Sequence, residues 1–163
     1  MFRTRIGLML AGLAGLCLVA PRSPSQVRER PAAPAPTAPR LVPVAEARLL
    51  MEGMTKPNFD GLVRTLKQKP ADAEGWAFAR GQALLVAESA NLLLIRPPHT
   101  RQAQEAWAPR SVELRDAGVK LARAAAAKDY VMARAGLASL TNACNHCHEA
   151  FRVPVRISPD GGE

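Results

Sequence analysis

Three residues near the C-terminal end of the chain have the types and the spacing to do chemistry. Cys144, Cys147 and His148 form a C-x-x-C-H pattern, which is the attachment pattern of a c-type haem. Two thiols three residues apart can each add to one of the two vinyl groups of a haem and form thioethers. The histidine that follows is then held beneath the iron as the proximal axial ligand. The pattern therefore predicts one covalent haem c with its iron.

Two other chemistries use similar residues, and both fit this chain less well. A structural zinc site needs four ligands, and outside the pattern the chain has one cysteine, Cys17, and one histidine, His99. A redox-active dithiol of the thioredoxin type belongs to a βαβ unit, and the sequence has no strand pattern that would build one. A pair of buried structural cysteines is the remaining alternative.

The N-terminal segment predicts export. Arg3 and Arg5 precede an uncharged run over residues 6–20 that consists mostly of Leu, Gly and Ala. This arrangement is typical of a secretory signal peptide, and the run is short for a transmembrane helix. The residues around Ala20 make a poor cleavage site, so removal of residues 1–20 and their retention as a membrane anchor both stay open. Export agrees with a covalent haem, because c-type haems are attached outside the bacterial cytoplasm.

Composition separates a spacer from a folded domain. Residues 21–43 contain seven prolines among Ala, Arg, Ser and Thr, which is typical of an extended, disordered linker. The chain carries a net charge of +8, but residues 1–43 account for +5 of it and the rest for only +3. The folded part has no basic stripe for phosphate contacts, which argues against nucleic-acid binding. The expected domain covers residues 44–156, and a frayed tail covers residues 157–163.

Apolar residues at helical spacing predict that this domain is all-α. A first helix is expected from Val44, with Met51 and Met54 on its apolar face. Pro57 is expected to interrupt this helix before a second piece over residues 59–68, because proline cannot donate a helical hydrogen bond and its ring crowds the preceding turn.

Three longer helices are expected to follow. They cover residues 72–95, 100–128 and 130–150, with Asp72 and Asp129 as N-caps and with Thr100 or Pro109 as alternative starts of the middle one. Trp76 and Phe78 are expected to pack in the core, as aromatic residues on helices usually do.

The last helix places the cysteines toward the core. Its inward stripe consists of Leu137, Leu140, Cys144, Cys147 and Phe151, which recur at close to a heptad spacing. Four amphipathic helices joined by short loops predict an antiparallel four-helix bundle with a cofactor in its core.

These features resemble class II cytochromes c, which comprise the cytochrome c prime group and its six-coordinate, methionine-ligated relatives. The resemblance covers about residues 44–156 and rests on a haem motif near the C-terminal end of a four-helix bundle, followed by an aromatic and a basic residue. It implies that Cys144 and Cys147 attach the haem, that His148 is an exposed proximal ligand, and that Arg152 lies beside the haem.

The resemblance also suggests a distal ligand. In the methionine-ligated relatives a methionine of the first helix binds the iron, whereas in cytochrome c prime an apolar residue of that helix shields an open position. A thioether sulfur is a suitable sixth ligand for haem iron. Met51 is preferred here because it lies a full turn inside the expected helix, and Met54, next to Pro57, is the alternative. Arg48 is a candidate partner for a haem propionate.

Two non-enzymatic functions follow. The first is an exported monohaem c-type cytochrome that transfers single electrons between redox proteins of the periplasm or of a membrane respiratory chain, with His148 and Met51 as iron ligands. The alternative is a five-coordinate protein that binds NO or CO as a sensor or scavenger. A peroxidase would need a distal acid–base pair, and only His99 is left for it. A homodimer and a membrane tether through residues 6–20 stay open.

Overall fold

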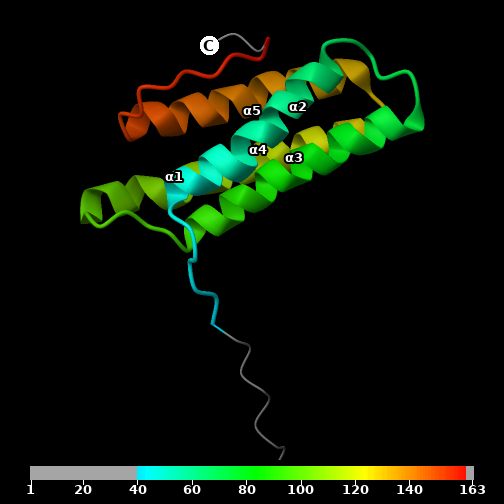
Figure 1. Ribbon diagram of the computed structural model, residues 1–163. Helices are drawn as coiled ribbons and strands as arrows, with labels where there is room; N and C mark the ends of the chain where they lie inside the picture. Colours follow the sequence, from blue (N-terminus) through cyan, green and yellow to red (C-terminus); the bar gives the residue numbers. More distant parts are fainter. Residues whose placement is uncertain (1–39, 161–163) are drawn as a thin grey trace, which may run out of the picture. The chain divides into compact units, whose positions relative to one another are not determined.

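The computed structural model describes residues 40–160 (Figure 1). The expected signal peptide or anchor over residues 1–20 and most of the linker over residues 21–43 lie outside the described residues. Within residues 40–160 the chain forms helices and connecting loops and no strand, so the prediction of an all-α domain is confirmed. No helix in this part of the chain is both long enough and apolar enough to cross a membrane.

The helices form a bundle of four helical segments. The first segment consists of α1 (Ala47–Leu50), a π-helical turn η1 (Met51–Thr55) and α2 (Lys56–Leu66), and it is followed by α3 (Ala73–Leu94), α4 (Arg101–Ala126) and α5 (Tyr130–Ala150). Short loops make consecutive segments antiparallel (Figure 1). Neighbours pack in a closed ring, with α2 on α3, α3 on α4, α4 on α5, and α5 back on α2.

Side-chain caps set the starts of two helices where the sequence predicts them. The Asp72 carboxylate accepts a hydrogen bond from the Gly75 N–H at 2.8 Å, and α3 begins directly afterwards. The Asp129 carboxylate accepts one from the Met132 N–H at 3.0 Å and starts α5 in the same way. Such bonds satisfy N–H groups that have no partner within the first turn of a helix. Both predicted N-caps are confirmed.

The helix α4 begins at Arg101, so a start near Pro109 is wrong. The Thr100 hydroxyl accepts a hydrogen bond from the Ala103 N–H, and the Trp107 indole N–H donates to the Leu93 carbonyl at 2.7 Å. These contacts hold the first two turns of α4 in helical form before the proline is reached, and α4 continues through it.

The prediction that Pro57 interrupts the first helix is also wrong. A proline removes one helical hydrogen bond, and its ring collides with the carbonyl four residues earlier, which is that of Gly53. The π turn η1 lies across this position, and its wider hydrogen bonds span five residues, as the Lys56 N–H shows by bonding the Met51 carbonyl. The wider turn accommodates Pro57, and the helix continues into α2.

The π turn also changes which residues of this segment face the core. Leu50 is buried, and the next buried side chain is that of Thr55, five residues later. Met51 and Met54 consequently lie half-buried at the edge of the core rather than at its centre. Val44, expected on the apolar face of the first helix, precedes that helix and is 97% exposed.

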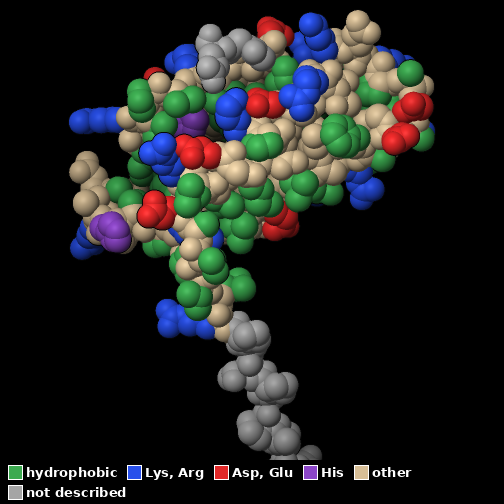
Figure 2. Space-filling model, in the orientation of Figure 1, with side chains coloured by type: hydrophobic (Ala, Val, Ile, Leu, Met, Phe, Trp, Pro, Cys, Tyr) green, Lys and Arg blue, Asp and Glu red, His purple; other side chains and the backbone are tan. Residues whose placement is uncertain are grey.

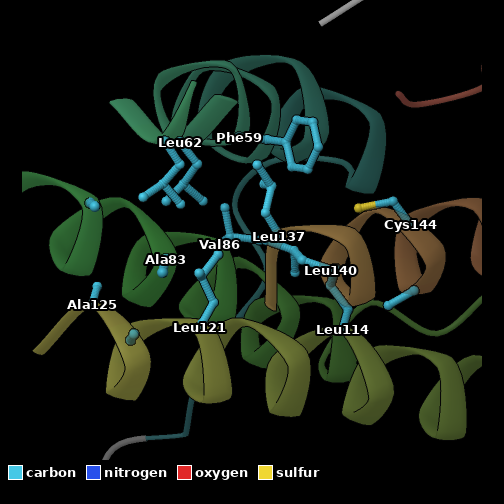
Figure 3. Close-up of a cluster of buried hydrophobic side chains, with 14 of the residues drawn as sticks. Phe59, Leu62, Ala83, Val86, Leu114, Leu121, Ala125, Leu137, Leu140 and Cys144 are labelled. Carbon is cyan, nitrogen blue, oxygen red and sulfur yellow. The ribbon is translucent and has the colours of Figure 1, made fainter. Parts of the chain in front are cut away.

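The core lies between the four segments and includes Cys144 at one end. Phe59 and Leu62 of α2 face Leu137 and Leu140 of α5 across it (Figure 3). Two glycines lie where neighbouring helices approach closely. A Cβ atom on Gly118 would lie 2.9 Å from the Ala83 carbonyl oxygen of α3, and one on Gly136 would lie 3.2 Å from Leu121 of α4.

The expectation for the aromatic residues of α3 is half right. Trp76 is buried, as predicted, whereas Phe78 is 55% exposed. Leu84 and Leu85 are also exposed on this helix. Because α3 is apolar on nearly every side, its sequence pattern does not identify the side that faces the other helices.

Charges of both signs are mixed on the surface. On the face shown in Figure 2, Lys and Arg side chains alternate with Asp and Glu over the described domain. Several of them pair one helical turn apart, as Lys56 does with Asp60 at 3.1 Å and Arg48 with Glu52 at 2.8 Å. This face of the described domain therefore has no extended patch of only positive or only negative side chains.

The chain after α5 is described as far as Asp160, and both Ile157 and Asp160 contact side chains of α5. This segment runs back beside α5 (red beside orange in Figure 1). Ile157 packs against the core, and residues 161–163 lie outside the described part.

Candidate functional site

The two motif cysteines lie on the last two turns of α5. Cys144 is 8% exposed and belongs to the core cluster, and its sulfur points toward the space beneath Phe59 (Figure 3). Cys147, one turn later, is half-buried. Both are free thiols and form no disulfide with each other. The spacing therefore places two reduced sulfur atoms on neighbouring turns of one helix.

Burial determines the protonation of both thiols. Burial raises the pKa of the Cys144 thiol to about 12, and the nearby Cys147 adds to this effect. Burial also raises the pKa of Cys147, although Arg110 opposes the shift and Glu113 supports it. Both side chains are therefore neutral thiols near neutral pH. The reactive nucleophile is the thiolate, so both cysteines react slowly in this state.

His148 is held through one of its two ring nitrogens. Its Nδ1 lies 2.8 Å from the carbonyl oxygen of Val155. A carbonyl oxygen can only accept, so Nδ1 carries a proton and donates it, and in the neutral tautomer the lone pair is on Nε2. This arrangement is the usual one for a metal-binding histidine, whose second nitrogen donates to a carbonyl or carboxylate.

A sharp turn brings Val155 back to His148. Arg152 adopts a left-handed backbone conformation with φ of 55°, the Val153 N–H donates to the His148 carbonyl at 2.8 Å, and the Arg152 N–H donates to the Glu149 carbonyl at 3.2 Å. These two bonds form a Schellman motif, which ends a helix and redirects the chain. The Arg152 side chain, expected beside a haem, is exposed at this turn.

Asn145 fixes the returning segment. Its side-chain N–H donates to the Ile157 carbonyl at 2.9 Å, and its side-chain oxygen accepts from the Ile157 N–H at 2.8 Å. Farther along, the Arg134 guanidinium contacts the Asp160 carboxylate at 3.4 Å. These contacts leave no signal in the sequence, because their partners include main-chain groups of an irregular segment.

A polar group on α4 lies on the other side of the motif. The Glu113 carboxylate is 2.8 Å from Nδ1 of His146 and 2.6 Å from the Arg110 guanidinium. Burial alone would raise the pKa of Glu113, but these two hydrogen bonds and the charges of both partners hold it below its ordinary value. The group links α4 to α5 beside Cys147.

Two aromatic rings stand at the same end of the bundle. Trp107 of α4 and Phe151 meet edge to face, with ring centroids 5.1 Å apart. Trp107 was not identified from the sequence. The antiparallel pairing of the start of α4 with the end of α5 is the signal that would have brought it to the site.

The candidate distal residues lie on another helical segment at this end. The bundle is antiparallel, so the start of the first segment, with Met51 and Met54, lies at the same end as the C-terminus of α5. The π turn that carries them packs against α3, whereas α2 contacts both α3 and α5. Arg48, a candidate for a propionate, is paired with Glu52 in solvent. His99 is exposed in the loop before α4.

The residues at this end include the donor types that a covalent haem uses. Two free thiols lie on adjacent turns, and the neutral tautomer of His148 has its lone pair on Nε2. The half-buried side chains of Met51, Met54 and Trp107 pack against the core. Within residues 40–160, no three His, Cys, Asp or Glu side chains come together in a way that could hold a metal ion by themselves.

Comparison with known proteins returned no relative: no family model, no curated protein and no solved structure matches the chain. The function is therefore inferred from the side chains and contacts described above.

Proposed function

We propose that the chain is an exported monohaem c-type cytochrome that carries single electrons. Cys144 and Cys147 attach the haem through thioethers, and His148 is the proximal ligand of its iron. The observation that carries this proposal is the hydrogen bond from Nδ1 of His148 to the Val155 carbonyl, directly beside two free thiols in C-x-x-C-H spacing. A bound haem supplies a one-electron couple at its iron.

The two cysteines anchor the group to a rigid element. Both belong to the 21-residue helix α5, and Cys144 is part of the packed core. Attachment through two residues of one helix would hold the group to that helix at two points. Because thioethers carry no charge, burial at Cys144 costs no desolvation of a thiolate.

His148 would supply the proximal ligand through Nε2. The Val155 carbonyl favours the tautomer of the neutral ring that carries its proton on Nδ1 and has its lone pair on Nε2. The same bond fixes the rotation of the imidazole ring. An imidazole held in this way would present the same nitrogen to a bound iron.

Met51 is the proposed distal ligand, and Met54 is its alternative. Both lie half-buried on the π turn, at the end of the bundle that carries the motif. π turns inside α-helices occur frequently at functional sites, because they change the direction of side chains over a short stretch. A methionine sulfur favours reduced iron and gives a higher potential than most other axial ligands.

The wider setting follows from the N-terminal residues and the resemblance to class II cytochromes c. The protein would act in the periplasm or at the outer face of a membrane, with other redox proteins as partners. The tether through residues 6–20 and a homodimer remain open alternatives, and no enzymatic activity is proposed.

Optical spectra of protein produced in a host that matures c-type cytochromes test the proposal. We expect a low-spin reduced spectrum, a methionine–iron charge-transfer band when the protein is oxidised, and no response to CO. The substitution His148→Ala should abolish this spectrum, and a wild-type spectrum in that variant would refute the ligand assignment. High-spin iron that binds CO rapidly would instead identify the five-coordinate, gas-binding alternative.

The distal ligand is identified by a matched pair of variants. Met51→Leu and Met54→Leu remove one sulfur each and retain apolar volume at neighbouring positions of the π turn. We expect Met51→Leu to lose the charge-transfer band and to bind CO, and Met54→Leu to retain the wild-type spectrum. The reverse pattern would assign Met54 to the iron.

A further inference from the structure

We propose that Asn145 is a positioning residue for the proximal ligand, acting through the segment that follows α5. This inference rests on the proposed function, because it concerns how His148 presents its lone pair to the iron. Asn145 occupies the first variable position of the C-x-x-C-H motif, where the chemistry of attachment makes no demand on the side chain.

The acceptor that orients His148 has no secondary structure to hold it. Val155 lies in an irregular segment, and its side chain is 48% exposed. The Schellman turn at Arg152 directs this segment back toward α5 but fixes only its first residues. A further contact must therefore keep the Val155 carbonyl at 2.8 Å from Nδ1.

Asn145 makes a contact of this kind with Ile157, two residues after Val155. Its amide binds both the N–H and the carbonyl of Ile157, at 2.8 and 2.9 Å, in the way that a neighbouring strand would. The Val155 carbonyl and both main-chain groups of Ile157, two residues apart, thus all bind side chains of α5.

Asn145 and His148, the two side chains of α5 that bind the returning segment, lie next to each other on the helix. Asn145 and His148 are three residues apart on a helix, so their side chains are neighbours on its surface. The apolar side chain of Ile157 packs on the core, and the contact between Arg134 and Asp160 holds the segment at its far end. Within the described residues, Asn145 is the only side chain of α5 other than His148 itself that hydrogen-bonds the main chain of residues 153–160.

The effect on the iron follows from the hydrogen bond. An imidazole that donates its Nδ1 proton to a carbonyl is a more basic ligand through Nε2, and its ring orientation is fixed. A more basic ligand favours oxidised iron and lowers the reduction potential. Loss of the Asn145 contacts should therefore raise the potential and expose the Nδ1 proton of His148 to solvent.

A graded set of variants in the haem-loaded protein tests this role. Asn145→Ala removes both bonds to Ile157, Asn145→Asp retains only the acceptor, and Asn142→Ala is the control at an exposed asparagine one turn earlier. The first measurement is the reduction potential. The second is the exchange of the His148 Nδ1 proton with solvent, followed by ¹⁵N-histidine NMR in the reduced protein, or in its CO complex if the iron binds CO.

We expect Asn145→Ala to raise the potential and to accelerate exchange of the Nδ1 proton about fivefold to tenfold, as the loss of one net hydrogen bond would. Asn145→Asp should give an intermediate result, and Asn142→Ala should match the wild type. An effect on stability alone, with unchanged potential and exchange, would overturn the proposal.

A second pair of variants leaves the haem motif intact. Ile157→Pro removes the N–H that Asn145 accepts, whereas Ile157→Ala retains that N–H and removes apolar contact. The proposal expects a higher potential for Ile157→Pro than for Ile157→Ala, and equal values would contradict it. Wild-type protein without covalent haem would refute the proposed function instead, so the two failures are distinguishable.

Discussion

At the scale of single residues, Cys144 and Cys147 have the same chemistry in different surroundings. Cys144 is 8% exposed with a pKa of about 12, and Cys147 is half-buried. In the haem-free chain we expect iodoacetamide to alkylate Cys147 several times faster than Cys144, because only exposed thiolates react rapidly. Peptide mass spectrometry at increasing reaction times measures both rates. Equal rates would show that Cys144 is not packed in the core.

The ionised carboxylate of Glu113 makes a pH-dependent contribution to the free energy of unfolding. Its pKa is lowered from 4.5, so its contribution is present above that value and is lost as the pH falls through the lower value of the folded state. We expect Glu113→Gln to lose less stability than the wild type on acidification from about pH 5 to pH 3. The difference should be about 0.5 kcal/mol or less, since solvent screens a partly exposed group.

Urea unfolding of the wild type and Glu113→Gln at a series of pH values measures the contribution of Glu113 to the free energy of unfolding. Glu105→Gln is the charge-matched control, at an exposed glutamate of the same helix that lies 3.6 Å from Arg101. Identical acid dependence in the two variants would argue against a contribution from the contacts of Glu113 with His146 and Arg110.

The residues proposed to bind the haem are visible in the sequence, whereas those that contact them are not. Cys144, Cys147 and His148 are recognisable because their types and spacing define a chemistry. Val155 and Ile157 act through main-chain groups, which every residue has, so nothing in their identity marks them. Asn145 could have been noticed only with knowledge of where the chain goes after Arg152.

At the scale of helices, the close approach of α3 and α4 depends on Gly118. A Cβ atom there would lie 2.9 Å from the Ala83 carbonyl oxygen and 3.1 Å from the Ala87 side chain. We expect Gly118→Ala to destabilise the protein by about 1–3 kcal/mol, because the two helices must separate to admit a methyl group. Denaturant unfolding followed by circular dichroism measures the change.

Gly81 provides the matched control on α3. A Cβ atom at this position would meet nothing within 4 Å, so Gly81→Ala should stabilise the helix by about 0.5–1 kcal/mol through backbone propensity alone. We therefore expect the free energy of unfolding to fall for Gly118→Ala and to rise for Gly81→Ala. Stabilisation by Gly118→Ala would mean that α3 and α4 lie farther apart than described here.

Helix bounds are predictable from the sequence where nearby residues determine them, and not where distant contacts do. Asp72 and Asp129 are local signals, and the helices that they cap begin where expected. The π turn is not a local signal, because it is stabilised by packing across the bundle. One such contact is the buried hydrogen bond of 2.9 Å between the hydroxyl groups of Thr55 and Ser89. Pro57 alone therefore indicated a break where the folded chain has a wider turn.

At the scale of the whole molecule, the bundle is predictable because four amphipathic segments with short loops have few ways to bury their apolar faces. The orientation of α3 is less predictable, as the exposed Phe78 shows. The candidate site is a consequence of the antiparallel order, which places the π turn, the start of α4 and the end of α5 at one end.

The most direct test of the account is the intact mass of the denatured protein after production in a host that matures c-type cytochromes. We predict the mass of the chain plus one haem, retained on a proteolytic peptide that contains Cys144 and Cys147, and its loss when both residues are replaced by serine. An unmodified mass with two alkylatable thiols would contradict the account, because the proposed electron-carrying function depends on that covalent group.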